Sequence, residues 1–274
     1  MYCNAACKKK HRHKHKKECE RRVAELHDEK LFKRPPHLED CPICMIRLPT
    51  LESGRMYMAC CGKILCIGCI YAVQSRSKGH PLCPFCRVLT PVSSSSDGEM
   101  IRRFEKRVEL NDSYAIYSMG TYYAVGLYGF HQNRAKALEF WHRAAELGNS
   151  SAYYNIALCY DHGSGVERDE KEANHYYELA ATGGDVKARL LLGKMEARAG
   201  NGDRALNHFM IAVRDGNLHS LEGIKRLYSK GHATKDEYAK ALRLYQAYLV
   251  EIKNNQRDQA AAAREDYKYY GSVV

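Results

Sequence analysis

The sequence contains no uninterrupted apolar run of about 18 residues, the length expected of a membrane-spanning helix. It also lacks the apolar core of a secretory signal peptide, because Met1-Tyr2-Cys3-Asn4 leads directly into a run of lysines. We therefore expect an intracellular protein, cytoplasmic or nuclear, without a membrane partner. Disulfides rarely persist in those compartments. The twelve cysteines need another explanation, and metal binding is the first to consider.

Acidic residues are too few to balance the basic ones, and the formal net charge is +11. Residues 1–107 hold 22 lysines and arginines against 11 aspartates and glutamates, whereas residues 108–274 hold 21 of each. A nucleic-acid-binding domain usually carries its basic surface on the part that grips the phosphates. Because the larger part of this chain is neutral, we do not expect nucleic acid as a partner.

Composition divides the chain into five stretches. The first is basic and is predicted to form a helix that stops at Pro35-Pro36, since proline ends helices. The third is rich in serine, which gives little to bury, and is predicted to be flexible. The predicted stretches are 1–37 (basic helix), 38–90 (zinc module), 91–100 (flexible linker), 101–252 (helical repeats) and 253–274 (C-terminal helical tail).

In residues 101–252 a sequence pattern recurs at a spacing that matches the length of one helical hairpin. Lys136-Ala137, Glu172-Ala173, Arg204-Ala205 and Lys240-Ala241 occupy one phase, at steps of 36, 32 and 36 residues. Units of this length cannot bury their apolar faces alone and must stack on their neighbours. The step of 32 predicts a shortened turn in the third unit, near residues 199–202.

Two segments, 154–166 and 136–148, resemble the first and second helices of the SEL-one-like repeat, a relative of the tetratricopeptide repeat. The resemblance covers residues 111–250 and implies a curved helical scaffold that binds other proteins. The last two units depart from the pattern, with Lys225 in place of a small residue and Glu196 in place of tyrosine. The tyrosines, Trp141 and Cys159 are predicted to be packing residues.

The cysteines of the zinc module form four pairs within 46 residues. Zinc prefers four soft ligands in a tetrahedron, and a Cys-x-x-Cys turn supplies two of them. Structural zinc contributes on the order of 10–16 kcal/mol of apparent binding energy, which compensates for the small apolar core of so short a segment. We predict two zinc ions, with the ligands Cys41, Cys44, Cys60, Cys61, Cys66, Cys69, Cys83 and Cys86.

This spacing resembles the RING family, whose ligands interleave. The resemblance implies that one zinc takes Cys41, Cys44, Cys66 and Cys69, and the other takes Cys60, Cys61, Cys83 and Cys86. The chain departs from the family at Lys63, where the family has a histidine ligand, and a protonated lysine offers no lone pair. We expect an all-cysteine variant. The alternative is that His80 replaces Cys60 or Cys61. The expected fold is a small cross-braced zinc module tethered to an all-α solenoid.

What the RING resemblance implies about function is a ubiquitin ligase, which holds a ubiquitin-conjugating enzyme and performs no covalent chemistry itself. The family contacts that enzyme at three positions, which are Ile43, Pro84 and Arg87 in this chain. These residues could also be a core residue, a turn former and a solvated charge. The predicted function is a ligase whose repeats select a protein substrate, with no catalytic residue of its own. The alternative is a non-catalytic adaptor with a structural zinc module.

The N-terminal residues Cys3, Cys7, His15 and Cys19 resemble the second half of a MYND zinc finger. That family needs four further cysteines upstream of these residues, and Met1 leaves no room for them in this sequence. Three interpretations remain open: the true start lies upstream, the segment is a relic, or these four residues form one improvised metal site. The basic run 8–17 could be a nuclear-import signal, but the solvated face of a helix explains it as well.

Overall fold

The described part of the chain is mainly helical, and the computed structural model describes residues 16–35, 39–77, 81–90 and 97–271. No helix within these ranges is long and apolar enough to cross a bilayer. Helix α2 spans Lys16–Leu31 and precedes the cysteine-rich residues. It ends before Pro35, as predicted. The chain then passes over the repeats, where the Phe32 ring lies 4.7 Å from that of His208.

Residues 39–77 and 81–90 form a small unit, here called the cysteine module. Its two strands, β1 (Arg55–Met58) and β2 (Lys63–Cys66), pair antiparallel with Met58 opposite Lys63. Gly62 supports the turn between them with a φ of 70°, a backbone conformation that glycine adopts readily. The 3-10 helix η1 (Glu52–Gly54) precedes β1, and helix α3 (Ile67–Gln74) follows β2 directly. This small unit therefore has little more than a hairpin and one helix for a core.

Residues 97–252 form helical hairpins that stack side by side. Seven of their helices begin after an Asp, Asn or Thr whose side-chain oxygen accepts a backbone N–H of the first turn, which satisfies otherwise unpaired donors. The helices are α4 (Asp97–Glu109), α5 (Ser113–Val125), α6 (Arg134–Glu146), α7 (Ser150–His162), α8 (Glu170–Thr182), α9 (Val186–Arg198), α10 (Gly202–Arg214), α11 (Leu218–Ser229) and α12 (Lys235–Ile252).

Small residues and aromatics fill the space between these helices. Trp141 of α6 is buried against α5 so closely that a Cβ added to Gly120 would lie 2.7 Å from its ring. Cys159 lies in the same buried cluster. The packing roles predicted for Trp141 and Cys159 are therefore confirmed.

The turn lengths follow the predicted repeat steps. Residues 199–201 alone join α9 to α10, whereas residues 126–133 join α5 to α6. The shortened turn predicted for the third unit is confirmed. The predicted linker is too long at its C-terminal end, because α4 begins at Asp97. The carboxylates of Asp97 and Glu99 favour this helix N-terminus, and Glu99 also pairs with Arg103 at 2.9 Å.

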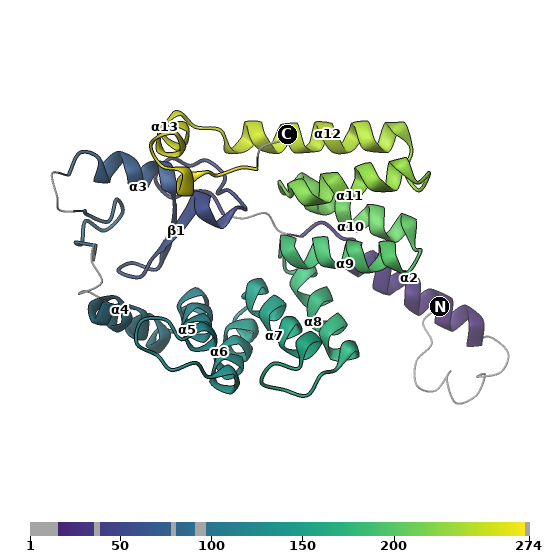
Figure 1. The fold of residues 1–274 in the computed structure, drawn as a ribbon, viewed down its shortest axis with the longest axis horizontal. Coiled ribbons are helices and arrows are strands. Elements are labelled where there is room, and N and C mark those ends of the chain that lie inside the picture. The colour runs from purple at the N-terminus through teal and green to yellow at the C-terminus, as the bar shows by residue number, and fades with distance from the viewer. Residues whose placement is uncertain (1–15, 36–38, 78–80, 91–96, 272–274) are drawn as a thin grey trace.

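The repeats curve around the cysteine module instead of trailing from it (Figure 1). At the start of the repeats, the Tyr57 hydroxyl donates to Asp112 over 2.6 Å, and its ring stacks on Tyr114. At the other end, Arg47 donates to Asp215 over 2.7 Å and to Glu251 over 2.7 Å. The predicted tether is therefore accompanied by direct packing, because the module carries side chains that complement both ends of the solenoid.

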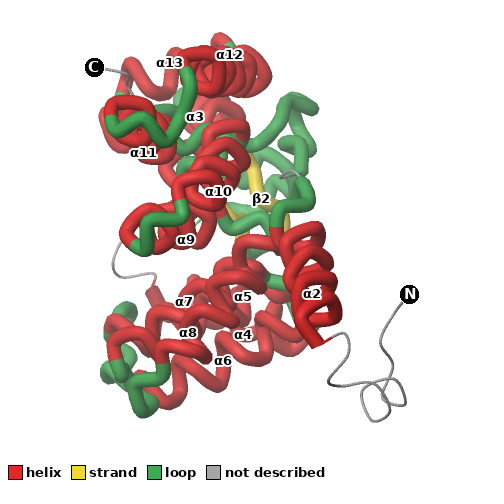
Figure 2. Tube along the Cα trace, turned by 90° about the vertical axis from the view of Figure 1, so that its right-hand side faces the viewer, coloured by secondary structure: helices red, strands yellow, loops and turns green. Residues whose placement is uncertain are grey.

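The two outer segments of the chain also pack onto other parts of it. Helix α2 lies along the repeats (Figure 2), where His27 contacts Glu178 at 2.9 Å. Helix α13 (Asn255–Ala263), followed by the 3-10 helix η3 (Glu265–Tyr267), turns back onto α3 of the cysteine module. The predicted C-terminal tail is thus partly helical and closes the curve.

Candidate metal centre

Two loops of the cysteine module share one backbone conformation. The Met45 N–H donates to the Cys41 carbonyl over 2.9 Å, and the Arg87 N–H donates to the Cys83 carbonyl over 2.9 Å. Both Met45 and Arg87 have a positive φ, of 54° and 64°. Each loop therefore folds back on itself after its Cys-x-x-Cys segment, which directs two sulfurs to one point.

The eight cysteines gather into two groups of four. In each group the four sulfurs lie within 4.8 Å of one another, and these are the groups that the interleaved pattern implies. Lys63 stays outside both, whereas Cys60 and Cys61 belong to the same group. His80 lies outside the described residues. The first cluster is Cys41, Cys44, Cys66 and Cys69, and the second cluster is Cys60, Cys61, Cys83 and Cys86.

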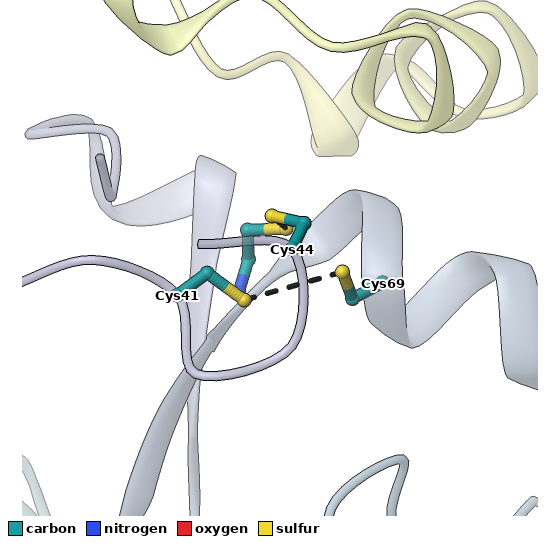
Figure 3. A group of neighbouring side chains, drawn as sticks. Cys41, Cys44 and Cys69 are labelled. Carbon is teal, nitrogen blue, oxygen red and sulfur yellow. Dashed lines mark hydrogen bonds between the residues drawn. The ribbon is translucent and has the colours of Figure 1, made fainter. Parts of the chain in front are cut away.

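The distances between sulfurs fit a tetrahedral zinc site. A Zn–S bond of about 2.3 Å places the ligand sulfurs about 3.8 Å apart, whereas a disulfide needs about 2.05 Å. Figure 3 shows Cys41 and Cys69 facing each other, with Cys44 beside them. The sulfur pairs are Cys41–Cys69 at 4.0 Å, Cys44–Cys66 at 3.8 Å, Cys61–Cys83 at 3.8 Å and Cys60–Cys86 at 3.4 Å. The residues present therefore fit two zinc ions.

Burial disfavours the thiolate form of two cysteines in the second cluster, Cys60 and Cys61. Burial raises the pKa of the Cys60 thiol, and hydrogen bonding with Cys86 raises it further. Burial raises the pKa of Cys61 to about 11, against the lowering effect of the Lys63 backbone N–H. Neighbouring thiols in a buried site resist joint ionisation because their negative charges repel. A dication at the centre reverses this preference, since thiolates are its ligands.

The three predicted partner contacts differ in exposure. The Ile43 side chain is 40% exposed and Arg87 is exposed, whereas Pro84 is buried. Pro84 therefore fits the role of a turn former. Sequence reasoning did not single out Met45 and Phe85, which are 73% and 45% exposed on the same two loops. Their position inside or next to a Cys-x-x-Cys segment was the available signal.

The N-terminal metal site remains a prediction. Cys3, Cys7 and His15 lie outside the described residues, and Cys19 lies on α2 with a half-buried side chain. The structure therefore does not test whether these four residues meet.

Two arginines that the sequence did not single out lie against the cysteine clusters. Arg257 of α13 donates to the Cys44 sulfur over 3.8 Å. Arg107 of α4 donates to the Ala59 carbonyl over 3.3 Å and to the Cys60 carbonyl over 3.4 Å. Neither arginine stands in a recognisable motif, so no local signal could have identified them.

Comparison with known proteins identifies the repeats. The Sel1 repeat family matches residues 113–149, 150–185 and 223–247, so the chain contains Sel1 repeats, which are protein-interaction scaffolds. The match leaves out residues 186–222, where Glu196 departs from the repeat pattern.

Individual relatives are similar over limited segments. Chitin synthase regulatory factor 4 of Schizosaccharomyces pombe is 29% identical over 128 residues, which cover 46% of this chain and 20% of that protein. The E3 ubiquitin-protein ligase DA2 of Arabidopsis thaliana is 37% identical over 51 residues, which cover 18% of this chain and 12% of that ligase. A solved Sel1 repeat protein from Oxalobacter formigenes is 32% identical, with a TM-score of 0.48 over 61% of this chain and 64% of its own. The chain thus spans a fifth or less of the two curated relatives.

Proposed function

We propose that this chain is a zinc-binding RING-type ubiquitin ligase, which recruits a ubiquitin-conjugating enzyme through the cysteine module and a protein substrate through the Sel1 repeats. The observation that carries the proposal is the pair of interleaved four-cysteine clusters whose loops expose apolar side chains. The short similarity to the ligase DA2 supports the same activity.

The ligands for the two zinc ions are the eight cysteines of the first and second clusters. The ions supply structural cross-links and no reaction step. Ile43 on the first loop would offer an apolar contact to the conjugating enzyme, and Arg87 on the second loop would offer a positive charge. Pro84 would hold the second loop in shape from its buried position. In this arrangement the chain positions a ubiquitin thioester for attack by a substrate lysine.

Substrate contacts would fall on parts of the repeats that the cysteine module leaves open. One such part is a pocket of about 440 Å³ between α5, α6 and α7. Its lining combines apolar and polar side chains, including Val125, Trp141, Asn155 and His162. A pocket lined by apolar and polar side chains could accept one side chain of a bound protein segment.

The test is autoubiquitination with a panel of conjugating enzymes. We expect Ile43→Ala and Arg87→Ala each to lower the rate at least tenfold while the zinc content stays at two ions per chain. Val250→Ala and Arg168→Ala are matched controls, because both residues are exposed on the repeats and neither lines the pocket. Equal activity in Ile43→Ala, Arg87→Ala and the unaltered protein, or no activity in any of them, would contradict the proposal.

A second candidate is a non-catalytic adaptor with a structural zinc module. The similarity to a chitin synthase regulatory factor favours it, because that protein is named as a regulator. An adaptor would retain both zinc ions and bind no conjugating enzyme. Titration of the zinc-loaded protein with the same panel, followed by calorimetry, separates the two candidates.

A further inference from the structure

The guanidinium of Arg257 is completely buried where the C-terminal segment meets the cysteine module. Its exposed fraction is 0%. Helix α13 approaches α3 so closely that a Cβ added to Gly68 would lie 2.6 Å from the backbone nitrogen of Arg257. The backbone of Arg257 thus lies at the tightest part of this contact, and the burial of its long charged side chain needs a compensating interaction.

The hydrogen-bond partners of Arg257 are carbonyls and one sulfur. Nη1 donates to the carbonyls of Arg47 over 2.8 Å and Ile252 over 2.7 Å. Nη2 donates to the carbonyl of Ile46 over 3.1 Å and to the Cys44 sulfur over 3.8 Å. Among the described residues no carboxylate pairs with this guanidinium. Of these hydrogen-bond partners, only the Cys44 sulfur of the first cluster can carry a negative charge.

A zinc ion held by four thiolates carries a net charge of −2, and such a charge is costly to bury without a cation nearby. Hydrogen bonds and charges around metal ligands also fix their orientation and affinity. We propose that Arg257 is the buried counter-charge of the first cluster, so that the C-terminal segment 255–271 retains the metal there. The inference rests on the zinc binding of the proposed function and is independent of ligase activity.

The second cluster provides an internal comparison. Arg107 approaches it from α4 but donates to the carbonyls of Ala59 and Cys60 and to no sulfur. It orders the loop that holds two ligands without contacting a ligand atom. Loss of Arg257 should therefore affect one of the two metal ions and leave the other unchanged.

The test measures zinc release to a chromogenic chelator from the full chain. The variants are Arg257→Met, which keeps length and removes charge, Arg257→Lys, which keeps charge, and Arg264→Met as a control on an exposed arginine of the same segment. We expect Arg257→Met to release one zinc per chain at least tenfold faster than the unaltered protein. The second zinc should leave at the unaltered rate, Arg257→Lys should be intermediate, and Arg264→Met should be unchanged.

Cobalt substitution separates a charge effect from a packing effect. Loss of a hydrogen bond to the Cys44 sulfur should move the sulfur-to-cobalt charge-transfer band to longer wavelength in Arg257→Met, and lysine should restore part of the shift. Unaltered release rates and an unaltered band in folded Arg257→Met would overturn the inference while leaving zinc binding intact. If that variant does not fold, unaltered release from Arg257→Lys overturns it. Absence of zinc from the unaltered protein would refute both the inference and the proposed function.

Discussion

Replacing Arg47 with methionine tests whether the cysteine module and the repeats unfold as one cooperative unit. The Arg47 side chain is 10% exposed and that of its partner Asp215 is 13% exposed, whereas Glu251 is 54% exposed. The substitution keeps the length of the side chain but leaves Asp215 as a nearly buried carboxylate without its cation. The Arg47 guanidinium also lies over the Tyr248 ring, 5.4 Å from its centre.

The structure sets the expected size of the effect. Removing one partner of a buried ion pair costs about 3–5 kcal/mol. Asp215 keeps slight access to water, and Glu251 can turn into solvent, so we expect a loss near the lower limit, about 3 kcal/mol. A double-mutant cycle with Asp215→Asn should give a coupling energy of about 2 kcal/mol, within the range found for contacting residues.

The assay is urea unfolding at a fixed zinc concentration, followed by two probes. Far-ultraviolet circular dichroism reports on all helices, and Trp141, the only tryptophan, reports on the first repeat. Coincident transitions justify a two-state treatment. Arg168→Met, at an exposed position, should change stability by less than about 0.5 kcal/mol. A similarly small effect of Arg47→Met, with no coupling in the cycle, would refute the reasoning.

Two further predictions follow from close packing and from burial. Gly68→Ala should lower the free energy of unfolding by about 1–3 kcal/mol, because the new methyl group meets the α13 backbone. The control Gly98→Ala should not destabilise the protein, because its methyl group would meet nothing within 4 Å. Equal urea midpoints for the two variants would contradict this prediction. Burial, with the charge of Arg189 adding to it, lowers the pKa of His208 to about 3. Between these pKa values His208 is protonated in the unfolded chain and neutral in the folded chain. The free energy of unfolding therefore decreases as the pH falls from about 6.5 towards 3, by about 1.4 kcal/mol per pH unit. His208→Gln should remove this part of the slope between pH 6.5 and 5, and identical slopes would exclude it.

The repeats could be predicted from the sequence because their signal is local and periodic. Ala137, Ala173, Ala205 and Ala241 recur at one phase, and all four are buried in the structure. The grouping of the cysteines could also be predicted from the sequence. Cys-x-x-Cys spacing places two sulfurs at the same site, so only a few groupings of the eight sulfurs are possible. The resemblance to a known family then selected the interleaved arrangement.

The contacts between the cysteine module and the helices around it could not be predicted from a local pattern of this kind. Arg47 and Asp215 are 168 residues apart, and nothing in either neighbourhood identifies the other as a partner. Arg257 stands between polar residues and an alanine run, which predicts a helix but not a buried charge. A basic side chain is exposed in most proteins, so only the fold shows that this one points inward.

Fastening both ends of the repeats to a single block has a mechanical consequence. A solenoid anchored at one end can flex like a spring, because each repeat contacts only its neighbours. Here Tyr57 fastens the first hairpin and Arg47 the last, so any change of curvature must strain or break one of these attachments. The arc is therefore held at a preset width, and a binding partner has to match that width instead of bending the arc to its own shape.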